Sequence, residues 1–216
     1  MRTDAVQIAE WRGLAAQRDG IDLIVGHHAH VVRGVELAGG SLIFYGLGNF
    51  LHLGTANMTS SGICRDYGLM AKVHLRKAAD GKLAIRAVEA IPVTDTHLRP
   101  RRLPGAQGNA RVHALNYLAG TLDDAAGKAR GLRFTPQSDG SGLFCLPGAE
   151  NDTGRVGVEP VAQVDLAAES ALGPVVHVVV VAVTTIGPAL AGDREHVAPI
   201  RLHLLRFASR HFAGLC

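Results

Sequence analysis

The most informative segment of the chain is Asp22-Leu23-Ile24-Val25-Gly26-His27-His28-Ala29-His30, in which a short apolar run is followed by three histidines within four positions. The apolar run predicts a buried strand over 21–25. Neutral imidazoles are common ligands of transition metals, and open α/β sheets bind ligands beyond the carboxyl ends of their strands. A single histidine here would more simply be a solvated turn residue or the partner of a carboxylate. Three together, two of them spaced H-x-H, favour a metal site.

The segments on either side of this one predict further strands and a helix. Gly39-Gly40 lies between two apolar runs and can take the positive φ of a tight hairpin, so we expect strands over 31–37 and 41–45. Before the first strand, apolar residues at helical spacing predict a helix over 4–18. The chain therefore begins with alternating helical and extended elements, as an α/β fold requires.

The middle of the chain predicts a second group of elements. Two β-prone runs, 68–76 and 83–93, are joined by a segment containing Asp80-Gly81, which is a strong hairpin signal. Apolar spacing predicts a helix from Asn109 to Ala129, whose apolar positions are better explained by core packing than by function. The Gly- and Ser-rich segment 137–157 is expected to end the domain.

The residues after the hairpin carry a family resemblance. Gly46-Leu47-Gly48-Asn49-Phe50 follows the histidine loop, and the whole stretch resembles the final metal-binding segment of the CapA-type capsule and poly-γ-glutamate synthesis proteins, a branch of the calcineurin-like metallophosphoesterases. That family has proline at the position of Ala29 and serine at the position of Gly46. The resemblance covers about residues 1–150 and is strongest over 21–50.

The resemblance implies a fold and a set of site residues. The expected fold is α/β: residues 1–157 would form the sheet-rich carboxyl-terminal half of a metallophosphoesterase-type α/β/β/α sandwich, followed by a tail, 158–216. His28 and His30 match the metal-binding H-x-H. His27 is the candidate catalytic residue, acting as a third ligand, an orienting group or a substrate contact. Gly26 and Asn49 would support the loop.

The same resemblance implies a cofactor and a partner. The expected cofactor is a divalent transition metal (Mn, Fe, Zn or Ni), and the expected function is a metal-dependent phosphoesterase-like site in capsule or poly-γ-glutamate synthesis. An anionic polymer or a phosphoester would be the substrate, at the cell envelope or in the cytoplasm. The alternative is a non-catalytic envelope module for polymer assembly or binding that keeps the fold.

Several motifs that the resemblance implies do not precede the histidine loop. Such enzymes build a two-metal site from an early Asp-x-His, a Gly-Asp-x-x-Asp and a Gly-Asn-His-Asp/Glu, whose carboxylates supply much of the charge that holds the ions. Asp95-Thr96-His97 spells Asp-x-His but follows the loop, and we interpret it as a turn. We therefore expect the amino-terminal part of the domain to be missing and this chain alone to be inactive.

Composition argues against a disordered, a nucleic-acid-binding and a membrane-spanning protein. With 47% hydrophobic and 19% charged residues among 216, the chain is globular, and its net charge of +3 is only mildly basic. The basic run Arg99-Pro100-Arg101-Arg102 lacks interleaved aromatic residues, so we interpret it as a solvated loop and expect no nucleic-acid partner. No apolar run is long enough for a transmembrane segment.

Overall fold

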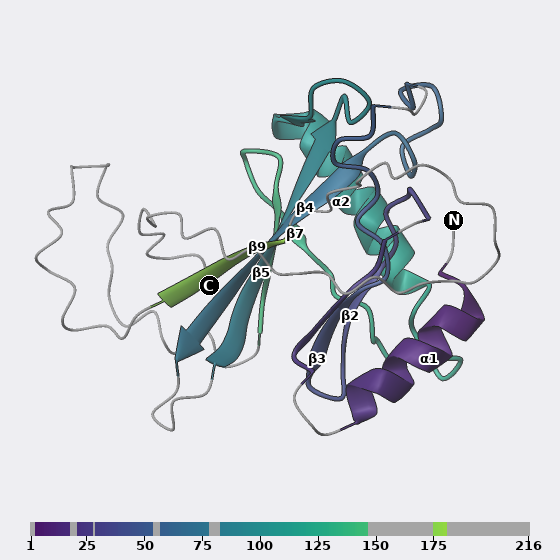
Figure 1. Cartoon of the computed structure of the whole chain (residues 1–216), viewed down its shortest axis with the longest axis vertical. Helices are drawn as coiled ribbons and strands as arrows, with labels where there is room; N and C mark the ends of the chain where they lie inside the picture. The colour runs from purple at the N-terminus through teal and green to yellow at the C-terminus, as the bar shows by residue number, and fades with distance from the viewer. Residues whose placement is uncertain are drawn as a thin grey trace, which may run out of the picture.

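The structure is a computed structural model that describes residues 3–17, 21–27, 29–53, 57–77, 83–146 and 175–180. Within these residues, two helices and nine strands form an α/β fold with two sheets, shown in Figure 1. The helices are α1 (Ala5–Ala16) and α2 (Gly105–Gly120). The strands are β1 (Leu23–Val25), β2 (Val35–Ala38), β3 (Ser41–Phe44), β4 (Gly68–Lys77), β5 (Leu83–Thr94), β6 (Arg101–Arg102), β7 (Thr135–Pro136), β8 (Gly142–Cys145) and β9 (Val175–Val180).

The first sheet has the strand order β1-β3-β2. β1 runs parallel to β3, with Leu23 opposite Leu42, whereas β2 and β3 form an antiparallel hairpin. Gly39 and Gly40 make its turn with φ of 59° and 92°, which glycine adopts without steric cost. The predicted hairpin is confirmed. The predicted strand over 31–37 is shorter than expected, because its first residues form only an isolated bridge between Val32 and Leu47.

The second sheet is built on the long antiparallel pair β4 and β5, which a bulge between His74 and Leu75 interrupts. Its strand order is β7-β8-β5-β4-β9, and β6 also pairs with β5. β9 therefore adds residues 175–180 to the edge of β4. The predicted Asp80-Gly81 turn and the predicted boundary near residue 157 lie outside the described residues.

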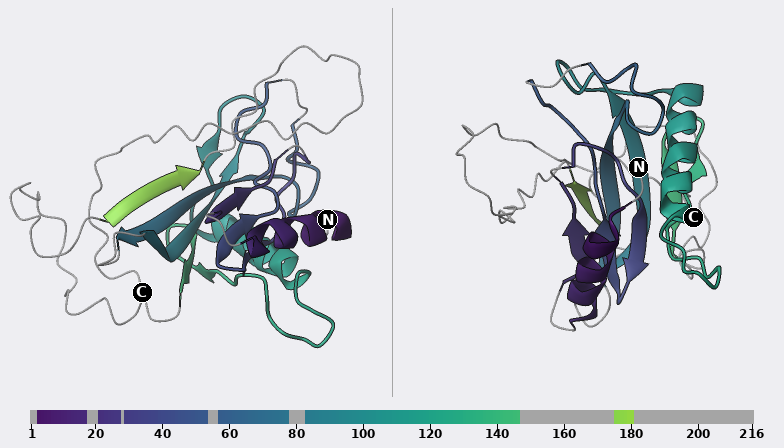
Figure 2. Two further views of the ribbon diagram at one scale, coloured as in Figure 1. Left: turned by 60° about the horizontal axis from the view of Figure 1, so that its bottom comes forward. Right: turned by 90° about the vertical axis from the view of Figure 1, so that its right-hand side faces the viewer.

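The core explains why β3 continues as an unbroken apolar run from Leu42 to Phe44. Leu42 and Phe44 face the large core shared with the second sheet and with Leu115 of α2. Ile43 and Tyr45 face the opposite way, into a smaller cluster with Ala15 of α1. α1 and α2 accordingly lie on opposite sides of this sheet (Figure 2). A strand covered on both faces reads as a continuous hydrophobic run instead of an alternating one.

Two predicted elements differ from the observed ones. α2 spans Gly105–Gly120 instead of 109–129, because Thr121 ends the helix and donates its hydroxyl to the carbonyl of Leu118. The predicted loop at the basic run contains β6, in which Arg101 and Arg102 pair with the end of β5. Neither described helix is long and apolar enough to cross a bilayer.

Candidate functional site

The histidine loop lies where two neighbouring parallel strands end. Because β1 and β3 are parallel, the residues that follow each strand emerge at the same edge of the sheet. The two connections are tied together: Gly26 donates its N–H to the carbonyl of Phe44 at 2.6 Å, and Leu47 donates to the carbonyl of Gly26 at 3.3 Å. The loop from Gly26 to His30 therefore lies against the segment that carries Asn49.

Gly26 also has a steric role where the loop meets the segment after β3. A Cβ atom there would lie 2.5 Å from Cη2 of Trp11 and 2.5 Å from the carbonyl oxygen of Tyr45. Such distances are well inside van der Waals contact, so only glycine fits without a shift of the backbone. Gly26, which we predicted to support the loop, thus allows α1 and the end of β3 to pack closely against the start of the loop.

His30 is held by Asn49. Its Nδ1 lies 2.6 Å from Oδ1 of Asn49, and with this oxygen as acceptor Nδ1 carries the proton. Asn49 is buried, and its carbonyl lies so close to Gly68 that a Cβ there would be only 1.8 Å away. His30 also has a positive φ of 53°, a conformation that non-glycine residues adopt mainly where the surroundings impose it. The ring of His30 is therefore fixed in place.

Two more imidazoles lie beside His30. The ring of His27 is 6.3 Å away, centre to centre, and the ring of His52 is 4.7 Å away. Sequence reasoning missed His52, because a lone histidine two positions after Gly-Asn-Phe has no signal of its own. Its place follows from the parallel pairing of β1 and β3, because residues after β3 then share the edge with the histidine loop.

The other residues predicted for the site have different outcomes. His28 lies outside the described residues. Asp95 follows β5 in a turn with a φ of 54° and forms an ion pair with Arg101, as the interpretation of this segment as a turn requires. Within the described part of the chain, no three His, Cys, Asp or Glu side chains are grouped closely enough to hold a metal ion.

A buried ion pair fastens α1 behind the loop, and sequence analysis did not predict it. Arg12 makes a bidentate contact with Glu36, with Nε to Oε1 at 2.8 Å and Nη2 to Oε2 at 2.6 Å. The hydroxyl of Tyr45 donates to Glu36 at 2.6 Å. Burial, reinforced by the hydrogen bond to Glu36, raises the pKa of Tyr45 above its usual range, so the phenol remains a proton donor. The charge of Glu36, hidden inside an apolar strand, is thereby compensated.

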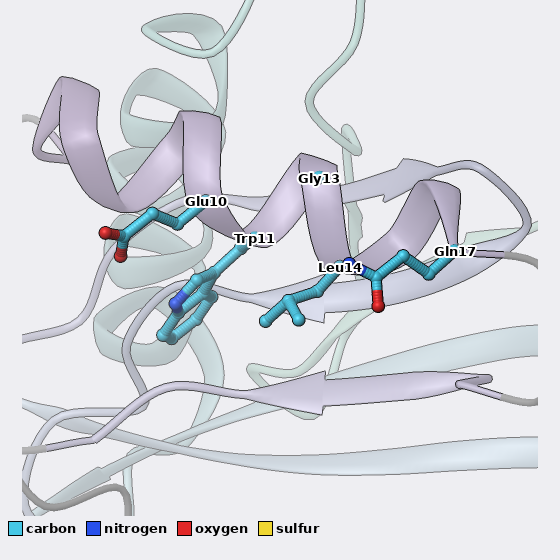
Figure 3. Close-up of a pocket in the computed structure, with 5 residues that line it drawn as sticks. All are labelled: Glu10, Trp11, Gly13, Leu14 and Gln17. Carbon is cyan, nitrogen blue, oxygen red and sulfur yellow. The ribbon is translucent and has the colours of Figure 1, made fainter.

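A hollow on the described surface runs along α1, away from the histidines. It is lined by Glu10, Trp11, Gly13, Leu14 and Gln17. Figure 3 shows Trp11 and Leu14 extending from the helix toward the strands beneath it. Trp11 also stacks on Tyr45, with ring centres 5.4 Å apart. Its mostly apolar lining makes this hollow a packing feature of α1, whereas the imidazole of His30 contacts Asn49.

Comparison with known proteins places the first part of the chain. A family model described as "Bacterial capsule synthesis protein PGA_cap" matches residues 3–53. The "PGA biosynthesis protein CapA" of Bacillus subtilis (strain 168) is 37% identical over 70 residues, which are 32% of this chain and 17% of that protein. The matched residues include the histidine loop and Asn49. The resemblance to CapA-type capsule synthesis proteins inferred from the sequence is thus confirmed over residues 3–53.

Proposed function

We propose that this chain supplies the histidine loop of a metal-dependent, phosphoesterase-like centre that acts in capsule or poly-γ-glutamate synthesis. The observation that carries the proposal is the 2.6 Å contact between Nδ1 of His30 and Asn49. Histidines that bind metals usually donate their second ring nitrogen to an oxygen acceptor, which fixes the tautomer and aims the other nitrogen at the ion. Asn49 is in place for this role before any ion arrives.

The donor set determines which ions suit the loop. His30 would bind through Nε2, and His28, two residues earlier, would be its partner in the H-x-H pattern. Imidazole nitrogens suit Zn²⁺, Fe²⁺, Ni²⁺ or Mn²⁺ better than the oxygen-seeking Ca²⁺ or Mg²⁺. When bound, such an ion would supply Lewis acidity toward a phosphoryl oxygen. His27, with its ring 6.3 Å from that of His30, is placed to contact a substrate or to orient the loop.

A non-catalytic polymer-binding module is the second candidate. The observation that favours it is the ion pair of Asp95 with Arg101, which engages the carboxylate of the chain's Asp-x-His sequence away from a metal. Two-metal hydrolysis depends on carboxylates to hold both ions. We therefore expect the chain by itself to bind an ion without hydrolysing phosphate esters.

Calorimetric titration with Zn²⁺ tests the proposal. The chain should bind Zn²⁺, and the double variant His28→Ala, His30→Ala should lose that binding. A His113→Ala variant is the control, because His113 lies on the exposed surface of α2 and should leave binding unchanged. Equal binding by the chain and the double variant would remove the ligand assignment. Zn²⁺- or Mn²⁺-dependent hydrolysis of bis(p-nitrophenyl) phosphate by this chain would instead contradict the expected lack of turnover.

A further inference from the structure

We propose that two neighbouring connections at one end of the molecule form a contact surface for an anionic lipid bilayer. The first connection joins β3 to β4, and the second joins β5 to β6. His52 in the first donates its N–H to the carbonyl of Thr96 in the second at 2.7 Å. Because Gly68 of β4 pairs with Val93 of β5, both connections emerge at the same end of the second sheet, which is uppermost in Figure 1.

These two connections expose large apolar side chains to water. Leu98 is 69% exposed and Leu53 is 66% exposed, the highest values among the large apolar residues that the structure describes. Leu51 and Ile63 in the first connection are exposed as well. Single apolar residues scattered over a surface need no explanation. Four of them within two connections that are hydrogen-bonded to each other indicate a contact surface.

The same two connections carry an excess of positive charge. Arg65 and Arg99 are exposed, and neither forms an ion pair within the described part of the chain. The carboxylates of these connections, Asp66 and Asp95, are each matched by an arginine, in α2 and in β6 respectively. The exposed apolar residues are therefore accompanied by guanidinium groups that are able to attract the phosphates of anionic lipids.

This combination suits the surface of a bilayer better than a nucleic acid or a protein groove. Apolar side chains can enter the headgroup region while neighbouring arginines stay at the level of the phosphates. Leu98 precedes Arg99 directly, and Ile63 lies two positions before Arg65, so each connection offers both kinds of side chain. The described parts of these connections expose no Phe, Tyr or Trp ring, although such rings stack on bases and dominate protein interfaces.

A bilayer contact at this surface would also place the histidine loop. Leu51 and Leu53 flank His52 in sequence, and the ring of His52 lies 4.7 Å from that of His30. The edge of the first sheet would then lie beside the membrane–water interface. This consequence does not depend on whether the loop binds a metal ion.

Sedimentation of the purified chain with vesicles tests the apolar part of the proposal. Vesicles of phosphatidylglycerol and phosphatidylcholine should bind the chain more tightly than vesicles of phosphatidylcholine alone. The double variant Leu53→Ser, Leu98→Ser should lower the partition coefficient by at least about tenfold, because it removes the side chains that leave water. The matched control is Val6→Ser, Tyr117→Ser, which changes residues that are 65% and 63% exposed on the two helices and should leave binding unchanged.

Two further variants test the charge. Arg99→Gln should weaken binding to the anionic vesicles by about fivefold. Lys128→Gln removes one exposed positive charge from the loop after α2 and should leave binding unchanged. Equal weakening by these two variants would mean that only the net charge of the chain matters, and would overturn the assignment of the surface.

Fluorescence quenching identifies the segment that touches the lipid. In Leu98→Trp, vesicles that contain brominated lipid should quench the added tryptophan, whereas Val6→Trp should be quenched no more than the unmodified chain, whose own tryptophan is Trp11. The proposal would be overturned by a chain that binds neither kind of vesicle, by binding that survives Leu53→Ser, Leu98→Ser, or by equal quenching in the two tryptophan variants. None of these measurements uses Zn²⁺, so failure of the proposed metal centre would not affect them.

Discussion

The edge of the first sheet and the strand ends of the second sheet hold their polar side chains in different ways. Around the second sheet, charges are matched directly: Arg102 of β6 pairs with Asp139 in the turn before β8, and Arg111 of α2 pairs with Asp66 just before β4. At the edge of the first sheet, an uncharged amide, Asn49, holds the imidazole of His30. An ion pair matches one charge with another, whereas the amide of Asn49 fixes a ring without adding a charge. The comparison therefore contrasts charge-matched pairs with a fixed, uncharged imidazole in the region where we propose binding.

The first prediction contrasts a buried with an exposed ion pair. Arg12→Met should lower the free energy of unfolding by about 3–5 kcal/mol, because it leaves Glu36 charged in a site where its side chain is only 1% exposed. Arg102→Met is the matched control, since both partners of its pair are largely exposed, and should cost less than about 1 kcal/mol. Urea denaturation measures both. If both variants lowered the free energy of unfolding by similar amounts, burial would not determine how much each ion pair stabilises the fold.

The second prediction concerns the close contact of Gly26 with Trp11 and with the carbonyl of Tyr45. Gly26→Ala should cost about 2–3 kcal/mol, because the new methyl group would lie 2.5 Å from both Trp11 and the Tyr45 carbonyl. Gly13→Ala, in the middle of α1 with nothing within 4 Å of its Cβ, should instead stabilise the chain by about 0.5–1 kcal/mol. Thermal or urea unfolding would show the opposite signs. If Gly26→Ala were tolerated as well as Gly13→Ala, the described close packing of the loop against α1 and β3 would be contradicted.

The third prediction separates two asparagine contacts. Asn49→Ala should weaken Zn²⁺ binding by about 10- to 100-fold, because His30 loses the acceptor that fixes its tautomer. Asn116→Ala should lower stability without changing Zn²⁺ affinity, since Asn116 bonds only to the backbone of Phe134, at 2.8 Å in both directions. If both variants bound Zn²⁺ alike, Asn49 would be another packing residue and the comparison between the regions would fail.

The fourth prediction, with the smallest expected effect, concerns the pH dependence of stability through Glu89 in β5. The side chain of His74, whose Nε2 lies 3.9 Å from Oε2 of Glu89, lowers the pKa of Glu89 below its ordinary value, with support from Lys72. A carboxylate with a lowered pKa in the folded state stabilises the fold above its unfolded pKa, and that stability is lost as the pH falls through the folded value. The free energy of unfolding should therefore drop less in Glu89→Gln than in the parent chain between pH 5 and pH 3. If the unfolding free energies of the two chains fell in parallel with pH, Glu89 would not contribute to the loss of stability in acid.

Much of the first sheet could be predicted from sequence because its signals are local. The apolar run before Gly26 and the Gly39-Gly40 turn specify β1 and the β2–β3 hairpin without reference to the rest of the chain. The end of α2 was less predictable, because the apolar pattern continues past Thr121 whereas the helix does not. Local periodicity reports which face is apolar but not where a side-chain hydrogen bond stops the helix.

The candidate site was only half predictable for a related reason. The H-x-H loop is contiguous, so its residue types suggest metal binding directly. His52 and the Arg12–Glu36 pair depend on which strands are neighbours, and sequence spacing does not specify that β1 runs parallel to β3. Glu36 in particular lies inside an apolar run, where the bidentate contact with Arg12 and the hydrogen bond from Tyr45 together explain a buried carboxylate.

The pH dependence of Zn²⁺ binding tests the central claim most directly. Metal binds neutral imidazole, so protons compete with the ion, and affinity measured by calorimetry should fall steeply between pH 7.5 and pH 5.5. The fall should approach about a hundredfold per pH unit if two histidines bind together and about tenfold if one does. A carboxylate site would keep nearly constant affinity, because its ligands stay ionised over this range. Flat binding between these two pH values would show that the loop from Gly26 to His30 is not the principal metal site.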